Sequence, residues 1–203
     1  MPVIFGAVGA PSTTSATDGA NLAVLQGKSG EVVDTNLHGK WYTAAYRNRV
    51  FIGSTLFAGV TVAAVSVGTA PTYTIFNPLG SGVNLELISF DLSAPLATTM
   101  VIGTIYGAMS IQTPTSVTAG GSTISIPVGG GGTSQAKLYT AATTTAATQL
   151  MILGTITATT YAAVHYEFDG KVVLAPGSCF SVLSSPVQTG VADISTVWAE
   201  WPI

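Results

Sequence analysis

The sequence predicts an all-β protein, an antiparallel β-sandwich or jelly roll of roughly ten strands. β-branched residues dominate the chain, and glycine and proline interrupt it at short intervals, which is typical of strands joined by turns. Long segments with apolar residues at three- and four-residue spacing, which would indicate amphipathic helices, are almost absent. The sequence contains no tandem repeat of the kind that would indicate a solenoid or a propeller.

The first thirty residues are expected to form an extended arm, because residues 10–20 are rich in proline, serine and threonine. The β-sandwich domain is expected to span residues 31–203. Residues 50–70 are uncharged and long enough to cross a bilayer. Small and polar residues recur there every two or three positions, however, which favours two strands joined by a turn near Ala58 and Gly59 over a membrane helix.

Each further strand is expected where a β-rich run lies between turn signals. Residues 83–93 show the clearest apolar–polar alternation, which fades toward Phe90 and Leu92, and parity places Glu86 and Asp91 on opposite faces of this strand. The turn expected at Asp169-Gly170 joins residues 161–168 and 171–174 into a hairpin. The other strands are expected over residues 31–35, 41–46, 49–57, 60–67, 73–76, 100–112, 136–140, 149–157, 179–183 and 191–201.

A Gly- and Thr-rich insert spans residues 113–148. Glycine runs at 120–121 and 129–132 bracket residues 122–128, which are expected to form a loop or a short flap that is mobile or bound to a partner. The sequence leaves open whether the insert is a loop or a strand in an interface. Residues 141–148 consist almost entirely of alanine and threonine and are also expected to form a loop.

The chain carries very little charge. Only 7% of its residues are Asp, Glu, Lys or Arg, whereas about 25% is usual. Residues 50–85, 92–136 and 138–166 contain none of the four. We expect so neutral a chain to hide much of its surface against copies of itself or within a lattice. The net charge of −3 and the single basic pair, Arg47 and Arg49, argue against nucleic acid as a partner.

The sequence offers no catalytic, cofactor-binding or metal-binding residues that stand out. Cys179 is the sole cysteine, which excludes an internal disulfide and a four-cysteine zinc site, and it is expected to be a small buried apolar residue. His165 and Glu167 share one face of a strand, but two ligands do not make a metal site, and an exposed polar face is expected. No serine-hydrolase elbow is present, and nothing favours a Ser-His-Asp triad among the many serines. An enzyme is therefore not expected.

Two segments near the C-terminus are similar in sequence to part of a known class of proteins. The run Ala-Pro-Gly-Ser-Cys-Phe-Ser-Val at 175–182 and the run Ile-Ser-Thr-Val-Trp-Ala-Glu-Trp-Pro at 194–202 resemble the C-terminal end of small virion structural proteins of tailed bacteriophages. Residues 41–55, with Asn77-Pro78 and Gly80-Ser81-Gly82, are similar in character. The resemblance covers about half of the chain, excludes the insert and brings no catalytic residue. It implies a β-sandwich or jelly-roll fold, often trimeric, placed on the capsid as cement or decoration or at tail and fibre ends.

The expected function is that of a non-enzymatic capsid cement or decoration protein that stabilises a phage head by bridging neighbouring capsid subunits. Its partners would be copies of itself, as a homotrimer, and the major capsid protein, without nucleic acid, membrane or cofactor. It would lie on the capsid exterior after assembly in the bacterial cytoplasm. Trp41, Tyr42 and Trp201 are the candidate interface residues. Trp41 and Tyr42 open one expected strand and Trp201 ends another; if that last strand is regular, Trp198 and Trp201 have opposite parity, so one faces in and one faces out. The alternative is a tail-fibre or baseplate head module that binds a host-surface receptor or glycan.

Overall fold

The computed structural model describes residues 41, 44–45, 47–55, 59–64, 72–95, 99–119, 122–125, 132–144 and 149–203. The chain divides into two units, Met1–Thr43 and Ala44–Ile203. The arm expected over residues 1–30 and the strand expected over residues 31–35 lie outside the described residues. The β-sandwich is formed by the second unit, Ala44–Ile203.

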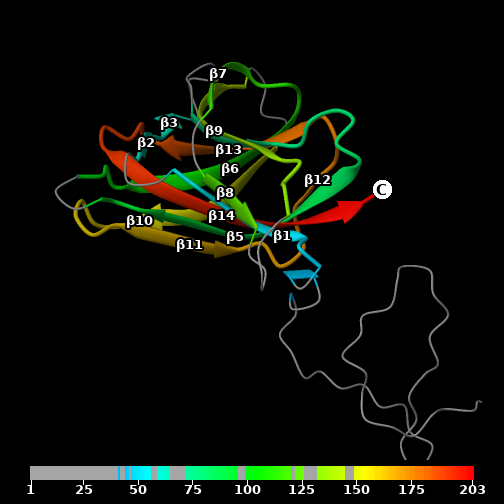
Figure 1. Ribbon diagram of the computed structural model, residues 1–203. Helices are drawn as coiled ribbons and strands as arrows, with labels where there is room; N and C mark the ends of the chain where they lie inside the picture. Colours follow the sequence, from blue (N-terminus) through cyan, green and yellow to red (C-terminus); the bar gives the residue numbers. More distant parts are fainter. Residues whose placement is uncertain are drawn as a thin grey trace, which may run out of the picture. The chain divides into compact units, whose positions relative to one another are not determined.

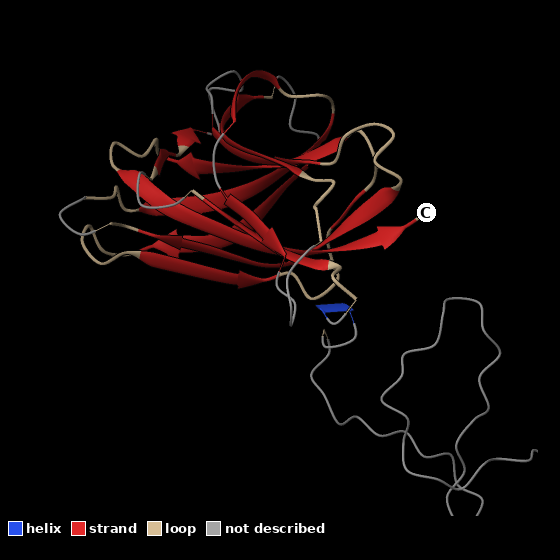
Figure 2. Ribbon diagram, viewed as in Figure 1, coloured by secondary structure: helices blue, strands red, loops and turns tan. Residues whose placement is uncertain are grey.

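This unit consists of two mainly antiparallel sheets of seven strands each, stacked as two layers (Figure 1; Figure 2). The sequence-based prediction of an all-β sandwich is therefore confirmed. Sheet 1 has the order β11 (Ala163–Glu167), β5 (Val83–Ser93), β14 (Val191–Pro202), β1 (Val50–Ser54) and β8 (Ser122–Ser125), with β12 (Val173–Leu174) beside β5 and β2 (Val60–Thr61) beside β14. Sheet 2 has the order β10 (Gln149–Ile156), β6 (Gly103–Ile111), β13 (Ser178–Ser185), β4 (Thr72–Phe76), β9 (Lys137–Thr143) and β7 (Thr115–Ala119), with β3 (Ala63–Ala64) parallel to β13.

The order of the principal strands is that of a jelly roll. Leaving aside the strands of residues 113–148 and the two-residue strands, the chain order is β1, β4, β5, β6, β10, β11, β13 and β14. Numbered one to eight, these strands lie in the order 1-8-3-6 in sheet 1 and 2-7-4-5 in sheet 2, the arrangement produced by two Greek keys. The described residues contain more strands than the roughly ten expected, because short strands and the insert add to this set.

The Gly- and Thr-rich insert contributes strands to both sheets, so the loop or flap expected over residues 122–128 is wrong for its described part. β8 pairs with β1, with Ile52 opposite Ile124, and β9 pairs with β4. β9 also continues to Thr143, into the expected Ala/Thr loop. The insert therefore extends sheet 1 beyond β1 and sheet 2 beyond β4.

The strand expected over residues 41–46 is wrong at Ala44 and Ala45, which are helical. The amides of Asn48 and Arg49 donate to the carbonyls of Ala45 and Ala44 at 3.0 and 2.9 Å, closing a tight turn before β1. The described part of residues 50–70 forms β1, β2 and β3, in agreement with the strands expected there.

The hairpin expected at Asp169-Gly170 is also wrong, although the turn is present. Both residues have positive φ, 48° and 77°, as the expected two-residue turn requires. β11 and β12 do not pair with each other, however, because both pair with β5, Glu167 opposite Ser89 and Val173 opposite Glu86. Residues 163–174 therefore run along one edge of β5, with the turn as an excursion from that edge.

The core lies between the two sheets and includes the fully buried Trp198 from sheet 1 and Phe180 from sheet 2. Complete burial of one such large apolar side chain stabilises the fold by about 1.5–3 kcal/mol. β14 supplies Trp198 through regular alternation, since Ala192, Ile194 and Thr196 are buried and the residues between them are partly exposed.

A β-bulge in β5 shifts its alternation. Val197 of β14 pairs with Ser89, but the next residue, Trp198, pairs with Leu87, so Ile88 is left out of the register. Odd-numbered residues before Ile88 and even-numbered residues after it therefore face the core. This explains the fading alternation, and it corrects the expectation for Glu86 and Asp91, which share the outer face.

Candidate functional site

Charged side chains are distributed unequally between the two sheets. Within the strands that the structure describes, Lys137 is the one charged residue of sheet 2. Sheet 1 carries only acidic ones, namely Glu86, Asp91, Glu167, Asp193 and Glu200. Glu200 is buried, whereas the other four alternate with core residues and belong to the outer face. The outer face of sheet 1 is therefore the candidate functional surface.

A row of polar residues crosses this face. Register places Ser54 of β1 opposite Ser195 of β14, Ser195 opposite Asp91 of β5, and Asp91 opposite His165 of β11. Directly paired residues point to the same side of a sheet. We call Ser54, Ser195, Asp91 and His165 the polar row. Its members come from four strands that are distant in the sequence, so no local motif could reveal it.

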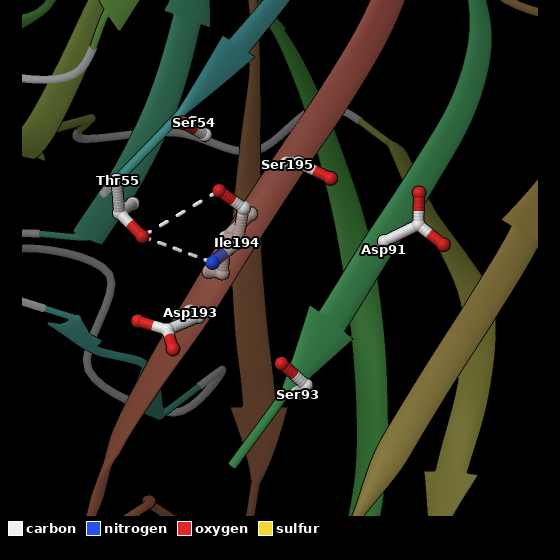
Figure 3. A pocket seen from close by; sticks show the side chains of 7 residues that line it. All are labelled: Ser54, Thr55, Asp91, Ser93, Asp193, Ile194 and Ser195. Atoms are coloured by element: carbon white, nitrogen blue, oxygen red, sulfur yellow. Dashed lines mark hydrogen bonds between the residues drawn. The ribbon is translucent and has the colours of Figure 1, made fainter. Parts of the chain in front are cut away.

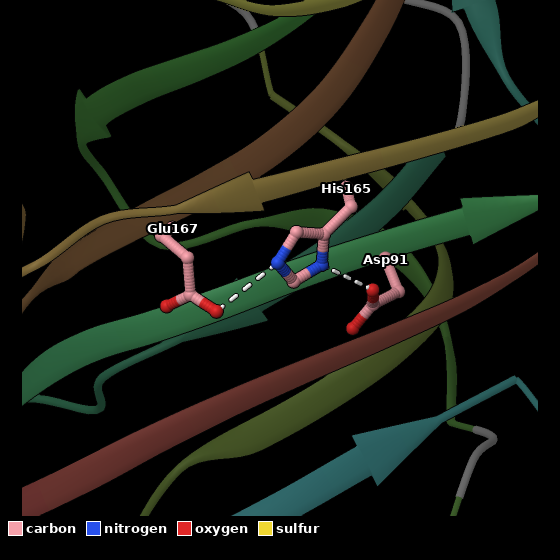
Figure 4. Close-up of polar contacts among 3 residues, drawn as sticks. All are labelled: Asp91, His165 and Glu167. Carbon is pink, nitrogen blue, oxygen red and sulfur yellow. Dashed lines mark hydrogen bonds and ion pairs between the residues drawn. The ribbon is translucent and has the colours of Figure 1, made fainter.

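His165 lies between two carboxylates (Figure 4). Its Nδ1 is 2.6 Å from Asp91 Oδ1 and its Nε2 is 3.1 Å from Glu167 Oε1. A neutral imidazole has one N–H, so only the imidazolium donates to both acceptors. The hydrogen bond to Asp91 is the largest cause of the raised pKa of His165. Desolvation opposes it, and the charges of both carboxylates and the hydrogen bond to Glu167 raise the pKa further. The expectations that His165 and Glu167 share a face and that this face is exposed are both confirmed, with 58% and 60% of the two side chains exposed.

The polar row lacks the order of a serine-hydrolase triad. In such a triad the histidine stands between the serine and the aspartate. Here Asp91 stands between Ser195 and His165. The two nitrogens of His165 also point to different carboxylates, those of Asp91 and Glu167. The described part of the chain contains no group of three or more His, Cys, Asp or Glu side chains suited to a metal ion.

A hollow of about 270 Å³ adjoins the polar row (Figure 3). Its described lining comprises residues of β1, β5 and β14 and the residue after β1, namely Ser54, Thr55, Asp91, Ser93, Asp193, Ile194 and Ser195. Thr55 fixes one wall, since its Oγ1 accepts a hydrogen bond of 3.0 Å from the amide of Ile194. Asp193 Oδ1 is buried and has no hydrogen-bond partner among the described residues. The accessible lining of the hollow is mainly apolar, with a few hydroxyl and carboxylate side chains among the lining residues.

Trp201, one of the candidate interface residues, is held on the outer face of sheet 1. Its Nε1 donates a hydrogen bond of 2.8 Å to Glu86 Oε2, and the guanidinium carbon of Arg49 lies 5.7 Å from the centroid of its ring. Trp201 is partly exposed and Trp198 is fully buried, so the expectation that one tryptophan faces in and one out is confirmed. Trp41 is partly buried, and Tyr42 lies outside the described residues.

Glu200 was not singled out by the sequence, although it accepts hydrogen bonds from several groups. Its carboxylate accepts hydrogen bonds from Ser134 Oγ at 2.6 Å, from the amide of Gln135 at 3.0 Å and from Trp198 Nε1 at 3.2 Å. Ser134 and Gln135 precede β9 of sheet 2, whereas Glu200 belongs to β14 of sheet 1. This buried carboxylate therefore links the two sheets and has a structural role.

Cys179 is fully buried, as expected, and its Sγ lies 3.1 Å from Ser110 Oγ. Burial raises the pKa of the Cys179 thiol, because the thiolate would lose its hydration, and this outweighs the opposite effect of Ser110. The thiol form is therefore favoured, which is typical of a structural cysteine.

No protein-family model matches the chain, and no significant match is found among curated proteins or solved structures. Among the described residues, no helix has the length and hydropathy needed to cross a membrane.

Proposed function

We propose that this chain is a non-enzymatic virion structural protein, a cement or decoration protein that stabilises a phage head by bridging neighbouring capsid subunits. The observation that carries the proposal is a jelly-roll strand order in which the described strands of one sheet contain a single charged residue. Jelly rolls are common in viral capsid proteins, although lectins and cupins share the fold. The scarcity of charge favours an assembled structural protein over a free lectin or enzyme more strongly than the fold does, because a free protein needs surface charge for solubility.

The mechanism would be mechanical. Hydroxyl and aliphatic side chains can be buried against a partner without the high cost of removing charges from water. Many small contacts would then bridge neighbouring subunits on the capsid exterior, with the protein as a homotrimer and the major capsid protein as its partner. Trp201 supports this role, since Glu86 and Arg49 hold its ring in place before any partner arrives.

The test is attachment to phage heads. The full chain and a variant lacking residues 1–30 are mixed with heads stripped of the protein, and the bound fraction is measured by co-sedimentation. The full chain is expected to bind in many copies per head, and the shortened chain to bind more weakly while keeping the circular dichroism spectrum of the sandwich. Equal binding of both would remove the arm from the mechanism, and failure of the full chain to bind any head would overturn the proposal.

A second candidate function is a tail-fibre or baseplate head module that binds a host receptor or glycan. The hollow beside the polar row favours it, because a mainly apolar lining with a few polar side chains is typical of small-molecule sites, and its serines and aspartates can hydrogen-bond to sugar hydroxyls. Labelling of intact particles with an antibody separates the candidates. A cement protein covers the head in many copies, whereas a tail module is confined to a few copies at the tail.

A further inference from the structure

A row of apolar residues crosses the outer face of sheet 2. Register places Ile152 of β10 opposite Tyr106 of β6, Tyr106 opposite Leu183 of β13, and Leu183 opposite Ala63 of β3. These residues share one side of the sheet. It is the outer side, because Ile105, the neighbour of Tyr106 in β6, faces the core. The row is thus the apolar counterpart of the polar row on sheet 1.

Exposure along this row rises from β3 to β10. Ala63 and Leu183 are 4% and 7% exposed, whereas Ile152 is 61% exposed. Leu150 lies on the same side of β10, opposite Ala108, and is 48% exposed. We call the exposed Leu150 and Ile152 of β10, together with the partly buried Tyr106 beside them on β6, the β10 face. Leu150 and Ile152 therefore form an exposed aliphatic pair on one face of one strand, and burying this pair against a partner would be favourable.

Resting on the self-assembly in the proposed function, we infer that the β10 face packs against the β10 face of further copies of this chain, around their common symmetry axis. Residues on a symmetry axis meet their own equivalents in every copy, so one neutral face is enough to form the contact.

Charge identifies the occupant as another copy. An ordinary protein surface, on which about 25–35% of the residues are charged, would bury charges against a face that has no opposite charge to offer. Lys137, the one charged residue in the described strands of sheet 2, lies on β9, and β6, β13 and β4 separate that strand from β10. The same face of a second copy is as neutral as the first, so its burial avoids this cost.

The experiment is the native mass of the full chain at micromolar concentration, measured by light scattering after gel filtration. Ile152→Lys and Leu150→Lys are compared with Val173→Lys, a control in β12 of sheet 1 whose valine is 54% exposed. Wild type is expected near three times the chain mass of 20.5 kDa. Each lysine on the β10 face should raise the dissociation constant by about tenfold or more and shift the mass toward 20.5 kDa, whereas the control stays assembled. Circular dichroism checks that each variant is folded.

An assembled wild type whose mass is unchanged by both β10 substitutions would overturn the inference and leave self-assembly in place. A monomeric wild type would also overturn it. In that case the co-sedimentation assay separates the two claims, since a monomer that still binds phage heads leaves the proposed function standing. Loss of assembly in the Val173→Lys control as well would show that the effect is not specific to the β10 face and would equally count against the inference.

Discussion

The hydroxyl of Tyr73, in sheet 2, donates a hydrogen bond of 2.9 Å to Thr196 Oγ1, in sheet 1. Both residues are completely buried, so this bond joins the two layers at the centre of the sandwich. Burial raises the pKa of Tyr73 far above that of an exposed tyrosine, because the phenolate would lose its hydration, and the hydrogen bond to Thr196 offsets this only in part.

Tyr73→Phe is expected to lower the free energy of unfolding by about 1–3 kcal/mol, since it removes the bond and leaves Thr196 Oγ1 without this partner in the core. Urea denaturation followed by fluorescence measures the loss. Tyr161→Phe is the control, because Tyr161 is 87% exposed and should change stability by no more than about 0.5 kcal/mol. Equal stability of the two variants would argue against a stabilising contact between Tyr73 and Thr196.

Glu200→Gln is expected to destabilise the sandwich by about 1–3 kcal/mol, because an amide group replaces a carboxylate oxygen that accepts hydrogen bonds. Glu200→Ala should cost more, since it leaves Ser134, Gln135 and Trp198 without this acceptor. Thermal unfolding measures both variants. Glu167→Gln, at an exposed ion pair, is the matched control with an expected loss below about 1 kcal/mol. If Glu200→Gln were no worse than this control, the link between the sheets would be unimportant.

The pKa of His165 should fall in Asp91→Asn, and by more than in Glu167→Gln, because the hydrogen bond to Asp91 is the largest cause of its upward shift. NMR titration of the imidazole protons measures this, and substitution of His38, the other histidine of the chain, assigns the signals. An equal pKa in wild type and Asp91→Asn would contradict the geometry.

The raised pKa also fixes the sign of the pH dependence. The contribution of the protonated His165, held by its carboxylates, to the stability of the fold is fully present below the ordinary histidine pKa of about 6.5. It is lost as the pH rises through the higher pKa of folded His165. Wild type should therefore exceed Asp91→Asn in stability by more at pH 6 than at pH 9. A difference that grew with pH would reverse this assignment.

Gly154→Ala is expected to destabilise the protein by about 1–3 kcal/mol through overpacking between β10 and β11. A Cβ at Gly154 would lie 2.5 Å from Val164 Cγ1 on the facing strand. Val164→Ala removes that methyl group, so the double variant should be more stable than the sum of the two single losses predicts. Denaturant midpoints of the four proteins measure the coupling. Simple additivity would show that the two residues do not meet.

Local pattern was enough to predict the sandwich and most long strands, because alternation and turn residues are encoded within each segment. It placed residues 83–93 in a strand with the bounds of β5. It missed the bulge at Ile88, which arises from register with β14 and has no local signature. At Asp169-Gly170 the turn was predicted correctly but its pairing was not, because β5 competes for both flanking strands.

The candidate site was less predictable for the same reason. Asp91 and His165 lie 74 residues apart in the sequence and meet only because β5 and β11 pair. That one tryptophan of β14 faces the core and the other faces outward could be predicted from alternation, since Trp198 and Trp201 lie in one strand at positions of opposite parity. Glu200 gave no signal, because two of its hydrogen-bond donors, Ser134 and Gln135, precede another strand in the opposite sheet.

The central place of β14 has a consequence for biosynthesis. β1 and β5 are synthesised before β14, yet both pair with it. Thr55 likewise hydrogen-bonds to Ile194, which is synthesised 139 residues later. Until β14 leaves the ribosome, each of these nascent strands lacks this neighbour and has an edge that can aggregate. Sheet 1 should therefore close last, and a cell producing many copies would depend on chaperones that shield unfinished chains.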